Sequence, residues 1–368
     1  MKRQVCNSLL CLFLLSGCII STEIIDEISI ISAIAYDKGS EDHLVKMSVN
    51  FPTFSEQVVE RKIEQETLQG EGDTPKAIIN KLNQRAQKPL VTGQLRMALF
   101  SEELADEGLE PYILPLYRDP TVGNRILLVV IEDGEAGELL INKISSEEQV
   151  GVFLADLVMQ NMERGPIPNV NLHEFLFDLY SDARDPYLPI IRKKDGSVDI
   201  TGLALFDRDV MKMKVDVAES FFIKLLLSNA GKSYHQFFVE VEDEKMPIVI
   251  EVVRSRLKRH LEHDEGEPKV TFTIDIKSEI YDTGGNINLE NKMEADDIEK
   301  QIEEEIVRAS ERLLNMFRDQ DIDPIGIGEL YRSKTRNWHP DEWASTIYHQ
   351  VSFEVEANVT LNVAGAVE

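Results

Sequence analysis

The sequence predicts an α+β protein, with a mixed α/β N-terminal domain followed by a mainly antiparallel sheet domain that carries one long amphipathic helix. The continuous apolar run Ile126–Ile131 indicates a central strand covered on both faces, and helical patterns flank it. Towards the C-terminus, long strands of alternating hydrophobicity accompany a helical pattern from Asp296 to Arg318. The two halves of the 368-residue chain therefore follow different architectures.

The first half alternates strand and helix patterns. A hairpin is expected from Ile24 to Phe51, with its turn at Asp37–Ser40. The polar stretch Glu56–Gly72 follows, and in it Val58 and Val59 favour part of a further strand. The other strands expected in this half are at Arg96–Phe100 and Arg125–Glu132. The expected helices are at Pro75–Ala86, Pro111–Tyr117, Val150–Met162 and Leu172–Leu179, with a further helical segment that contains Leu104.

Proline, charged residues and glycine gather between Asp182 and Ser197, a composition typical of a linker. A chain of this length commonly contains about two domains, so we expect a domain boundary there. The predicted division is a signal peptide at residues 1–17, an N-terminal domain at residues 18–196 and a C-terminal domain at residues 197–368. The turn near Gly266 is a candidate for a further subdivision.

The second half is richer in strands. The apolar stripe of the helix Asp296–Arg318 is widened by Val307 and Leu314, which favours packing on a sheet over a coiled coil. A loop-rich stretch through Trp338 and Trp343 precedes the last strand. The remaining elements expected in this half are a hairpin at Ile200–Val215, a helix at Ala218–Leu227, and strands around Phe237–Val241, Ile248–Leu257, Val270–Ile280 and Phe353–Val363.

The N-terminus has the residue order of a bacterial lipoprotein signal peptide. Lys2 and Arg3 precede the short apolar run Leu9–Leu15, and small residues then lead to a cysteine. A membrane-spanning helix requires about 20 apolar residues, and this run is far shorter. The predicted lipobox consists of Leu15, Ser16, Gly17 and the lipidated Cys18. Ordinary secretory cleavage is the alternative, and it leaves Cys18 as a free thiol.

Charge and cysteine content exclude several classes of protein. The formal net charge is −27, and it becomes more negative when Lys2 and Arg3 leave with the signal peptide, so nucleic acid and anionic lipid head groups are repelled. The three cysteines are Cys6, Cys11 and Cys18. Once the signal is removed, the predicted mature chain contains no disulfide, no thiolate metal ligand and no cysteine nucleophile beyond the lipidated residue.

Two glycine motifs resemble nucleotide-binding loops, but each lacks a required glycine. After Gly326-Ile327-Gly328, Tyr331 stands where a dinucleotide fingerprint has its third glycine. Before Gly231-Lys232-Ser233, Leu226 stands where a phosphate loop has its first glycine. We interpret both motifs as turns rather than as cofactor sites.

Other catalytic patterns are incomplete as well. The group with metal-ligand chemistry consists of His260, His263, Asp264, Glu265 and Glu267. A solvated acidic turn is the more ordinary interpretation of this group, because Gly266 and Pro268 accompany it. His173-Glu174 lacks a second histidine at the zinc-protease spacing, where Phe177 stands, and the sequence contains no Gly-x-Ser-x-Gly elbow. We therefore expect no enzyme activity, no metal and no cofactor.

Several stretches resemble the Ger(x)C family of spore germination lipoproteins, in the right order along essentially the whole chain. The stretches that carry the resemblance are the lipobox at Cys18, Gly202–Phe206, Asp323–Glu329, Trp338 with Trp343, and Asn362–Gly365. Members usually carry Trp-Asp directly after the lipidated cysteine, whereas Ile19 and Ile20 follow it here. Only the lipidation role is transferred by the resemblance, and it falls on Cys18.

The resemblance implies a non-enzymatic C subunit of a nutrient germinant receptor. Such a subunit is anchored by lipid at the outer face of the inner spore membrane, in the cell membrane of an endospore-forming bacterium. It acts with a multi-spanning A subunit and a membrane B subunit. A role as scaffold or signal-relay ectodomain in triggering germination is therefore expected.

The main alternative is a lipid-anchored solute-binding protein that hands a nutrient to a transporter. Such proteins usually contain two matched α/β lobes around a cleft, whereas the two halves of this sequence carry different patterns. A cell-wall hydrolase is a weaker alternative, because no catalytic constellation is present in the sequence.

Overall fold

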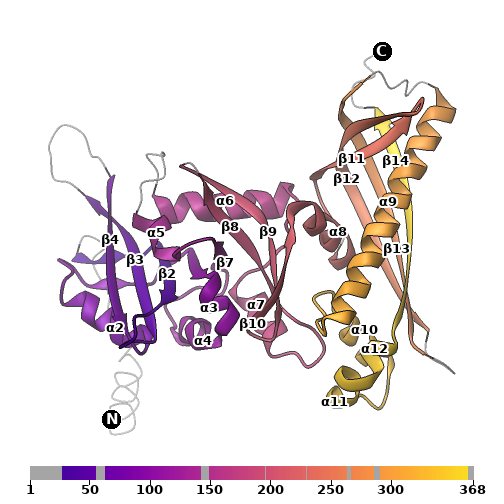
Figure 1. Ribbon diagram of the computed structural model, residues 1–368. Helices are drawn as coiled ribbons and strands as arrows, with labels where there is room; N and C mark the ends of the chain where they lie inside the picture. The colour runs from indigo at the N-terminus through magenta and orange to yellow at the C-terminus, as the bar shows by residue number, and fades with distance from the viewer. Residues whose placement is uncertain are drawn as a thin grey trace, which may run out of the picture.

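The computed structural model describes residues 27–54, 63–141, 149–194, 196–228, 230–262, 267–285 and 291–363. In this part of the chain, two large sheets lie beside each other and helices pack on both (Figure 1). A small parallel pair is formed by β1 (Ser29–Ile30) and β5 (Leu90–Val91). The predicted α+β class is confirmed.

The first sheet contains eight strands in the order β10-β9-β8-β7-β6-β2-β3-β4. Its central strands β2, β6, β7 and β8 are parallel, and antiparallel pairs extend it on both sides. The strands of this sheet are β2 (Ala33–Lys38), β3 (Val45–Phe54), β4 (Ile63–Gly72), β6 (Met97–Ser101), β7 (Leu127–Glu132), β8 (Tyr187–Lys194), β9 (Ser197–Asp207) and β10 (Val210–Asp216).

Helices cover both faces of this sheet. Every residue of β6 is buried, as are the first five residues of β7, so consecutive side chains on opposite faces are both shielded from water. Tyr36 stacks on Phe100 in this core, with ring centroids 5.3 Å apart. The covering helices are α2 (Pro75–Asn83), α3 (Glu102–Glu107), α4 (Glu110–Arg118), α5 (Ala136–Ile141), α6 (Val150–Arg164) and α7 (Leu172–Leu179). Thr74 caps α2 and Asn171 caps α7, because the side-chain oxygen of each accepts a hydrogen bond from a backbone N–H in the first turn.

Two local predictions in this half are wrong, and a third holds in part. The expected linker contains β8, whose Leu188, Ile190 and Ile191 are buried in the sheet. Part of the polar stretch before α2 forms a strand, the edge strand β4 paired with β3, in agreement with the partial strand expected there, although Val58 and Val59 lie outside the described residues. Asp37 lies at the buried end of β2 rather than in a turn, and its carboxylate accepts hydrogen bonds from the backbone N–H groups of Ala136 and Gly137.

The hairpin β9–β10 belongs to the first sheet, because β9 pairs with β8 from Tyr187↔Leu205 to Lys194↔Ser197. The proposed division at residues 196 and 197 therefore falls between two paired strands, and it stays a proposal about domains. The two sheets meet instead at α8 (Val217–Leu227), which contacts β9 and β10 of the first sheet and β12 and β13 of the second.

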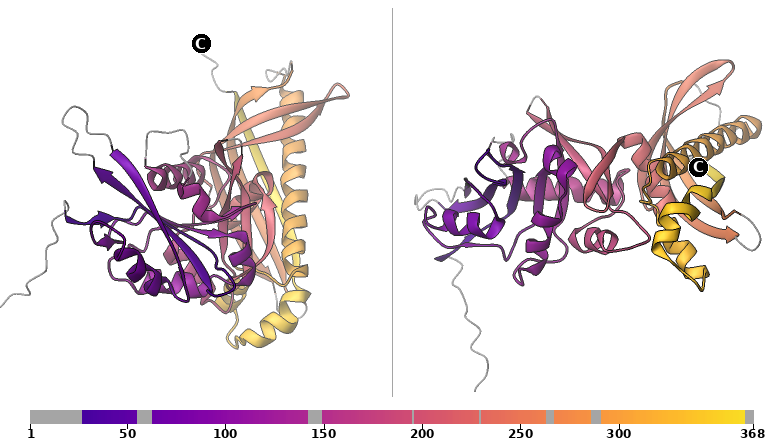
Figure 2. Two further views of the ribbon diagram at one scale, coloured as in Figure 1. Left: turned by 60° about the vertical axis from the view of Figure 1, so that its left-hand side comes forward. Right: turned by 60° about the horizontal axis from the view of Figure 1, so that its bottom comes forward.

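The second sheet contains four strands in the order β11-β12-β13-β14, and only the last pair is parallel. One long helix, α9, lies along the sheet (Figures 1 and 2). These elements are β11 (Ser233–Val241), β12 (Glu244–Glu262), β13 (Lys269–Thr283), β14 (Ser352–Val363) and α9 (Lys292–Asp319). Glu262 of β12 pairs with Lys269 of β13, so the strands on either side of the turn near Gly266 belong to one sheet; residues 263–266 themselves lie outside the described residues.

Side chains of α9 satisfy backbone groups on both outer strands of the second sheet. On β14, the N–H groups of residues 355, 359 and 361 donate to the carboxylates of Glu311, Glu303 and Glu299. On β11, the side-chain amide of Gln301 accepts from the N–H of Glu240 and donates to its carbonyl. Free strand edges invite pairing with other chains, and these side chains occupy part of both edges.

The stretch expected to be loop-rich is helical in most of its length. The helices there are α10 (Ile327–Lys334), α11 (Pro340–Glu342), the π-helical turn η2 (Trp343–Ile347) and α12 (Tyr348–Gln350). Trp338 and Trp343 face each other with ring centroids 5.7 Å apart, and Trp343 also packs against Tyr331 and Tyr348. Aromatic packing thus orders a segment whose sequence contains few periodic apolar residues.

Candidate functional site

The predicted lipidation site lies outside the described residues. Leu15, Ser16, Gly17 and Cys18 all precede Glu27, the first residue that the structure describes. Cys18 therefore stays a prediction, and the geometry of the described chain directs attention to a different place, the junction between the two sheets.

The junction is built around the buried carboxylate of Asp323, in the loop between α9 and α10. Its Oδ1 accepts hydrogen bonds from the N–H groups of Gly326 and Ile327, and its Oδ2 accepts one from Gly328, at 2.7–2.9 Å. Gly326 adopts a left-handed backbone conformation with φ 77°, which costs little only for glycine. The glycine motif that we interpreted as a turn is therefore the start of α10, wrapped around one acidic side chain.

The loop around Asp323 is bound to residues that follow α7 in the first half of the chain. The backbone N–H of Asp323 donates to the carboxylate of Asp185 at 2.7 Å, and the N–H of Asp185 donates to the carbonyl of Asp323 at 3.0 Å. A Cβ added to Gly328 would come within 2.7 Å of the Ala183 carbonyl and 2.8 Å of the Trp343 indole nitrogen. The two halves therefore touch backbone to backbone at this point.

Two cations extend the junction. Arg184 lies 3.4 Å from the carboxylate of Asp178, a residue of α7. Arg259 of β12 donates to the carbonyls of Leu226 and Leu227 at the end of α8, and to the carbonyl of Ile325. Carbonyl groups at a helix C-terminus lack partners within the helix, so a cation there stabilises the helix end.

A cation at a helix C-terminus also connects α8 to α6. Lys224 is a buried residue of α8, and its ammonium donates to the carbonyls of Met162 and Gly165 at the C-terminus of α6. Burial lowers the pKa of Lys224 to about 8. The helix that joins the two sheets is therefore held by a cation on each side, Lys224 towards the first sheet and Arg259 towards the second.

Burial also governs the acidic groups of the junction. It raises the pKa of Asp178 to about 7, against the opposing effect of Arg184, and it raises the pKa of Asp185 to about 6. The pKa of Asp323 is raised too, because burial outweighs the three backbone N–H donors. A cavity of about 260 Å³ opens beside these groups, with Trp343 and Tyr348 in its wall. Closely packed, buried carboxylates at a junction make its stability dependent on pH.

The structure does not assemble the catalytic patterns considered from the sequence. Among the described residues, no group of three or more histidine, cysteine, aspartate or glutamate side chains has the arrangement of a metal site. His260 is exposed and lies 3.6 Å from Glu262, whereas His263, Asp264 and Glu265 lie outside the described residues. Gly231-Lys232-Ser233 leads into β11 rather than into a helix, so it lacks the context of a phosphate loop.

Sequence reasoning missed the junction residues, although some carried a signal. Asp323-Pro324 and Asp185-Pro186 are both Asp-Pro pairs, and both aspartates bind the same loop backbone. In the sequence, Lys224 is notable because it stands between apolar residues of the helix predicted at Ala218–Leu227. No local pattern distinguishes Arg184 and Arg259 from surface arginines.

Comparisons with known proteins show the family. A family model described as "Spore germination protein N-terminal domain" matches residues 21–193, and one described as "Spore germination B3/ GerAC like, C-terminal" matches residues 201–365. The spore germination protein GerQC of Bacillus cereus is 33% identical over 371 residues, which cover 100% of both chains. The chain therefore belongs to the GerAC-like family of spore germination proteins, and the resemblance seen in the sequence is confirmed.

Two further matches agree. The putative spore germination protein YfkR of Bacillus subtilis (strain 168) is 24% identical over 306 residues, covering 80% of this chain and 77% of that one. Among solved structures, the crystal structure of the GerBC protein matches with a TM-score of 0.54 at 13% identity, covering 89% of this chain and 96% of that chain. This structural similarity supports the fold.

Proposed function

We propose that the chain is a lipid-anchored, non-enzymatic subunit of a spore nutrient germinant receptor, acting as a scaffold or signal-relay ectodomain. The observation that carries the proposal is the similarity to GerQC, which extends over the whole chain rather than over one domain. Both halves also match family models for spore germination proteins. The function is therefore assigned to the two halves acting together.

The anchor in this proposal is Cys18, within the lipobox that begins at Leu15. In the described part of the chain, no helix combines the length and the apolar character needed to cross a bilayer. One acyl chain binds a membrane only marginally, so stable attachment requires two or more, as on a diacylated cysteine. We place the folded body at the outer face of the inner spore membrane.

The partners in this proposal are an integral membrane A subunit and an integral membrane B subunit of the same receptor. The strongly negative net charge argues against nucleic acid as a partner. Since an acidic ectodomain is also repelled by anionic head groups, attraction to the membrane must come from lipid and from protein contacts.

The relay role is supported by the junction. A signal that reaches one half of an ectodomain passes to the other only if the two are mechanically coupled. Here the reciprocal bonds of Asp185 and Asp323, and the cations that hold α8, provide the coupling. Movement of the first sheet relative to the second would break buried polar contacts, so displacement of one half is expected to displace the other.

Family membership favours a non-catalytic role. The alternative of a solute-binding protein with two matched lobes gains little support, because one half has an eight-stranded mixed sheet and the other a four-stranded sheet along one long helix. A receptor subunit agrees better with these unequal halves.

The test is deletion of the gene in the source organism, in a strain that lacks parallel receptors. We expect nutrient-triggered release of calcium dipicolinate from spores to be lost and to return with the wild-type gene. A Cys18→Ala gene should restore little release, whereas Cys11→Ala, in the signal peptide but outside the lipobox, should restore it fully. Unchanged germination of the deletion strain with every nutrient tried would contradict the proposal.

A further inference from the structure

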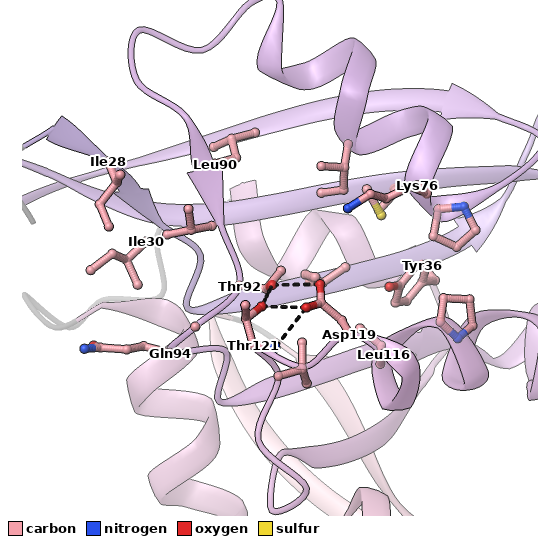
Figure 3. A pocket seen from close by; sticks show the side chains of 18 residues that line it. Ile28, Ile30, Tyr36, Lys76, Leu90, Thr92, Gln94, Leu116, Asp119 and Thr121 are labelled. Carbon is pink, nitrogen blue, oxygen red and sulfur yellow. Dashed lines mark hydrogen bonds between the residues drawn. The ribbon is translucent and has the colours of Figure 1, made fainter. Parts of the chain in front are cut away.

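A cavity of about 660 Å³ lies in the first half of the chain, away from the junction and outside the relay described above. It opens between the start of α2, the segment around β5 and the end of α4 (Figure 3). Its volume falls in the range of small-molecule sites, which is roughly 300–1,000 Å³. The cavity is therefore large enough for a ligand of its own.

Most of the cavity wall is aliphatic. The aliphatic side chains that line it are Ile28, Ile30, Ile34, Met47, Ile79, Leu90, Val91, Leu116 and Val122. They come from β1 and the residue before it, from β2, β3, α2 and β5, and from α4 and the loop after it, so the pocket is assembled from several separate parts of the chain. Such a wall favours a ligand with an aliphatic body, because removal of apolar surface from water against apolar side chains is favourable.

One cation faces the cavity without a carboxylate partner. Lys76 lies in the first turn of α2, and Figure 3 shows its nitrogen directed over the cavity. Among the described residues, no carboxylate lies within ion-pair distance of this ammonium group. Lys76 is exposed, and an ammonium group without an ion-pair partner beside an apolar wall attracts an anionic head group.

The inner end of the cavity contains an unpaired hydroxyl. The Tyr36 side chain is 1% exposed, and burial alone raises its pKa. No hydrogen bond joins its hydroxyl to any residue that the structure describes, and Figure 3 shows the oxygen pointing into the cavity. The hydroxyl oxygen is not among the fully enclosed polar atoms that lack a partner, so it is accessible from the cavity, and a ligand oxygen placed there would accept its hydrogen bond.

The remaining carboxylate of the lining is already satisfied. Asp119 accepts hydrogen bonds from the hydroxyls of Thr92 and Thr121 and from the N–H of Thr121, at 2.6–3.2 Å. Burial opposes ionisation of Asp119, but these bonds and the nearby charge of Lys76 hold the pKa of Asp119 below its usual value. Asp119 therefore shapes one wall and does not need a further cation, whereas Lys76 forms no ion pair with it and can accept a second anion.

We propose that this cavity binds a small monocarboxylate with an aliphatic body, with the carboxylate at Lys76 and an oxygen of the ligand within reach of Tyr36. Two sources supply this chemistry, a short fatty acid and an aliphatic α-amino acid. The site is separate from the relay role, so it stands or falls independently of the proposed function.

The test is calorimetric titration of the full-length chain in phospholipid nanodiscs, with empty nanodiscs as the blank. The probes are hexanoate and leucine for the two sources, and hexylamine as a match for size with the opposite charge. We expect at least one carboxylate to bind and hexylamine to bind at least roughly ten-fold more weakly. Binding of hexanoate alone, or of leucine alone, identifies the source.

The variant Lys76→Gln should weaken carboxylate binding several-fold, since a charged hydrogen bond from an exposed lysine is lost. Lys81→Gln is the matched control, because Lys81 lies on the same helix outside the cavity lining, and it should bind as the wild type does. Tyr36→Phe, which keeps the ring, should weaken binding several-fold. Three results would overturn the proposal: no heat with either carboxylate, equal affinity for hexylamine, or unchanged affinity in Lys76→Gln.

Discussion

The two sheets of this protein are buried in different ways. In the first sheet, consecutive residues of β6, such as Leu99 and Phe100, are both fully buried, because helices cover both faces. In β13 of the second sheet, Ile276 is 1% exposed while its neighbour Lys277 is exposed, because α9 covers one face only. The first sheet is therefore enclosed on both faces, and the second leaves a polar face available.

The largest expected effect tests this difference directly. Phe100→Ala should lower the free energy of unfolding by about 3–5 kcal/mol, and Leu99→Ala should lower it by about 2–5 kcal/mol. Each substitution leaves a cavity, because both side chains are buried in β6. In β13, Ile276→Ala should cost about 2–5 kcal/mol, whereas Lys277→Ala should stay within about 0.5 kcal/mol. Denaturant titration measures these changes. Equal costs for Ile276→Ala and Lys277→Ala would contradict one-sided burial of the second sheet.

The junction provides the next prediction. Asp323→Ala leaves the N–H groups of Gly326, Ile327 and Gly328 without their acceptor, and we expect a loss of about 3 kcal/mol in the free energy of unfolding. Asp319→Ala removes an exposed carboxylate nearby, and surface ion pairs contribute only about 0–1 kcal/mol. Thermal unfolding of the two variants makes the comparison. A similar small loss in both would mean that Asp323 does not organise the junction.

The buried acidic groups of the junction predict a pH dependence of the free energy of unfolding. Burial raises the pKa of Asp178 from 3.8 to about 7, so the folded chain holds this proton more tightly than the unfolded chain does. The contribution of Asp178 is greatest below about pH 4 and is lost as the pH rises to about 7. Asp178→Asn should therefore flatten the pH dependence of the unfolding free energy in this window, by up to about 1.4 kcal/mol per pH unit.

Denaturant titrations across this pH range check the slope. Asp156→Asn is the control, because Asp156 is exposed and lies 3.9 Å from Arg96. Its slope should equal that of the wild type. Identical slopes for Asp178→Asn and the wild type would show that Asp178 does not take up a proton in this range.

The smallest expected effect concerns the edge of the second sheet. Glu303→Ala removes the acceptor of the Val359 N–H, and we expect a loss of about 1 kcal/mol and faster hydrogen exchange at that amide. Glu304→Ala, one position along the same helix, should leave the exchange rate at Val359 unchanged. Hydrogen exchange read out by mass spectrometry distinguishes the two. Equal protection of the Val359 amide from exchange in both variants would mean that α9 does not supply a hydrogen-bond acceptor to this edge of the sheet.

Sequence patterns predicted the elements whose side chains repeat. The long helix and β13 were predictable because one-sided burial leaves a clear alternation, as in Phe272, Ile274 and Ile276. The start of α2 was predictable from Thr74 and Pro75. For β4 the sequence indicated only part of a strand, because a polar edge strand has no apolar face to reveal its full length.

The junction was harder to predict because its contacts join distant parts of the chain. Asp185 and Asp323 are separated by 138 positions, and neither has a local pattern that announces the other. Proline and charge around β8 were interpreted as a linker, yet Ile190 and Ile191 are buried by strands and helices that come from elsewhere in the sequence. Long-range pairing overrides local composition at both places.

The most direct test of the proposed receptor role is isolation of the tagged chain from the inner membranes of spores, with untagged spores as the control. We expect the integral membrane A and B subunits to be recovered with it in comparable amounts, and Cys18 to carry lipid when the N-terminal peptide is analysed by mass spectrometry. Recovery of the chain without either membrane subunit, under conditions in which both are present in the extract, would contradict its role as a receptor subunit.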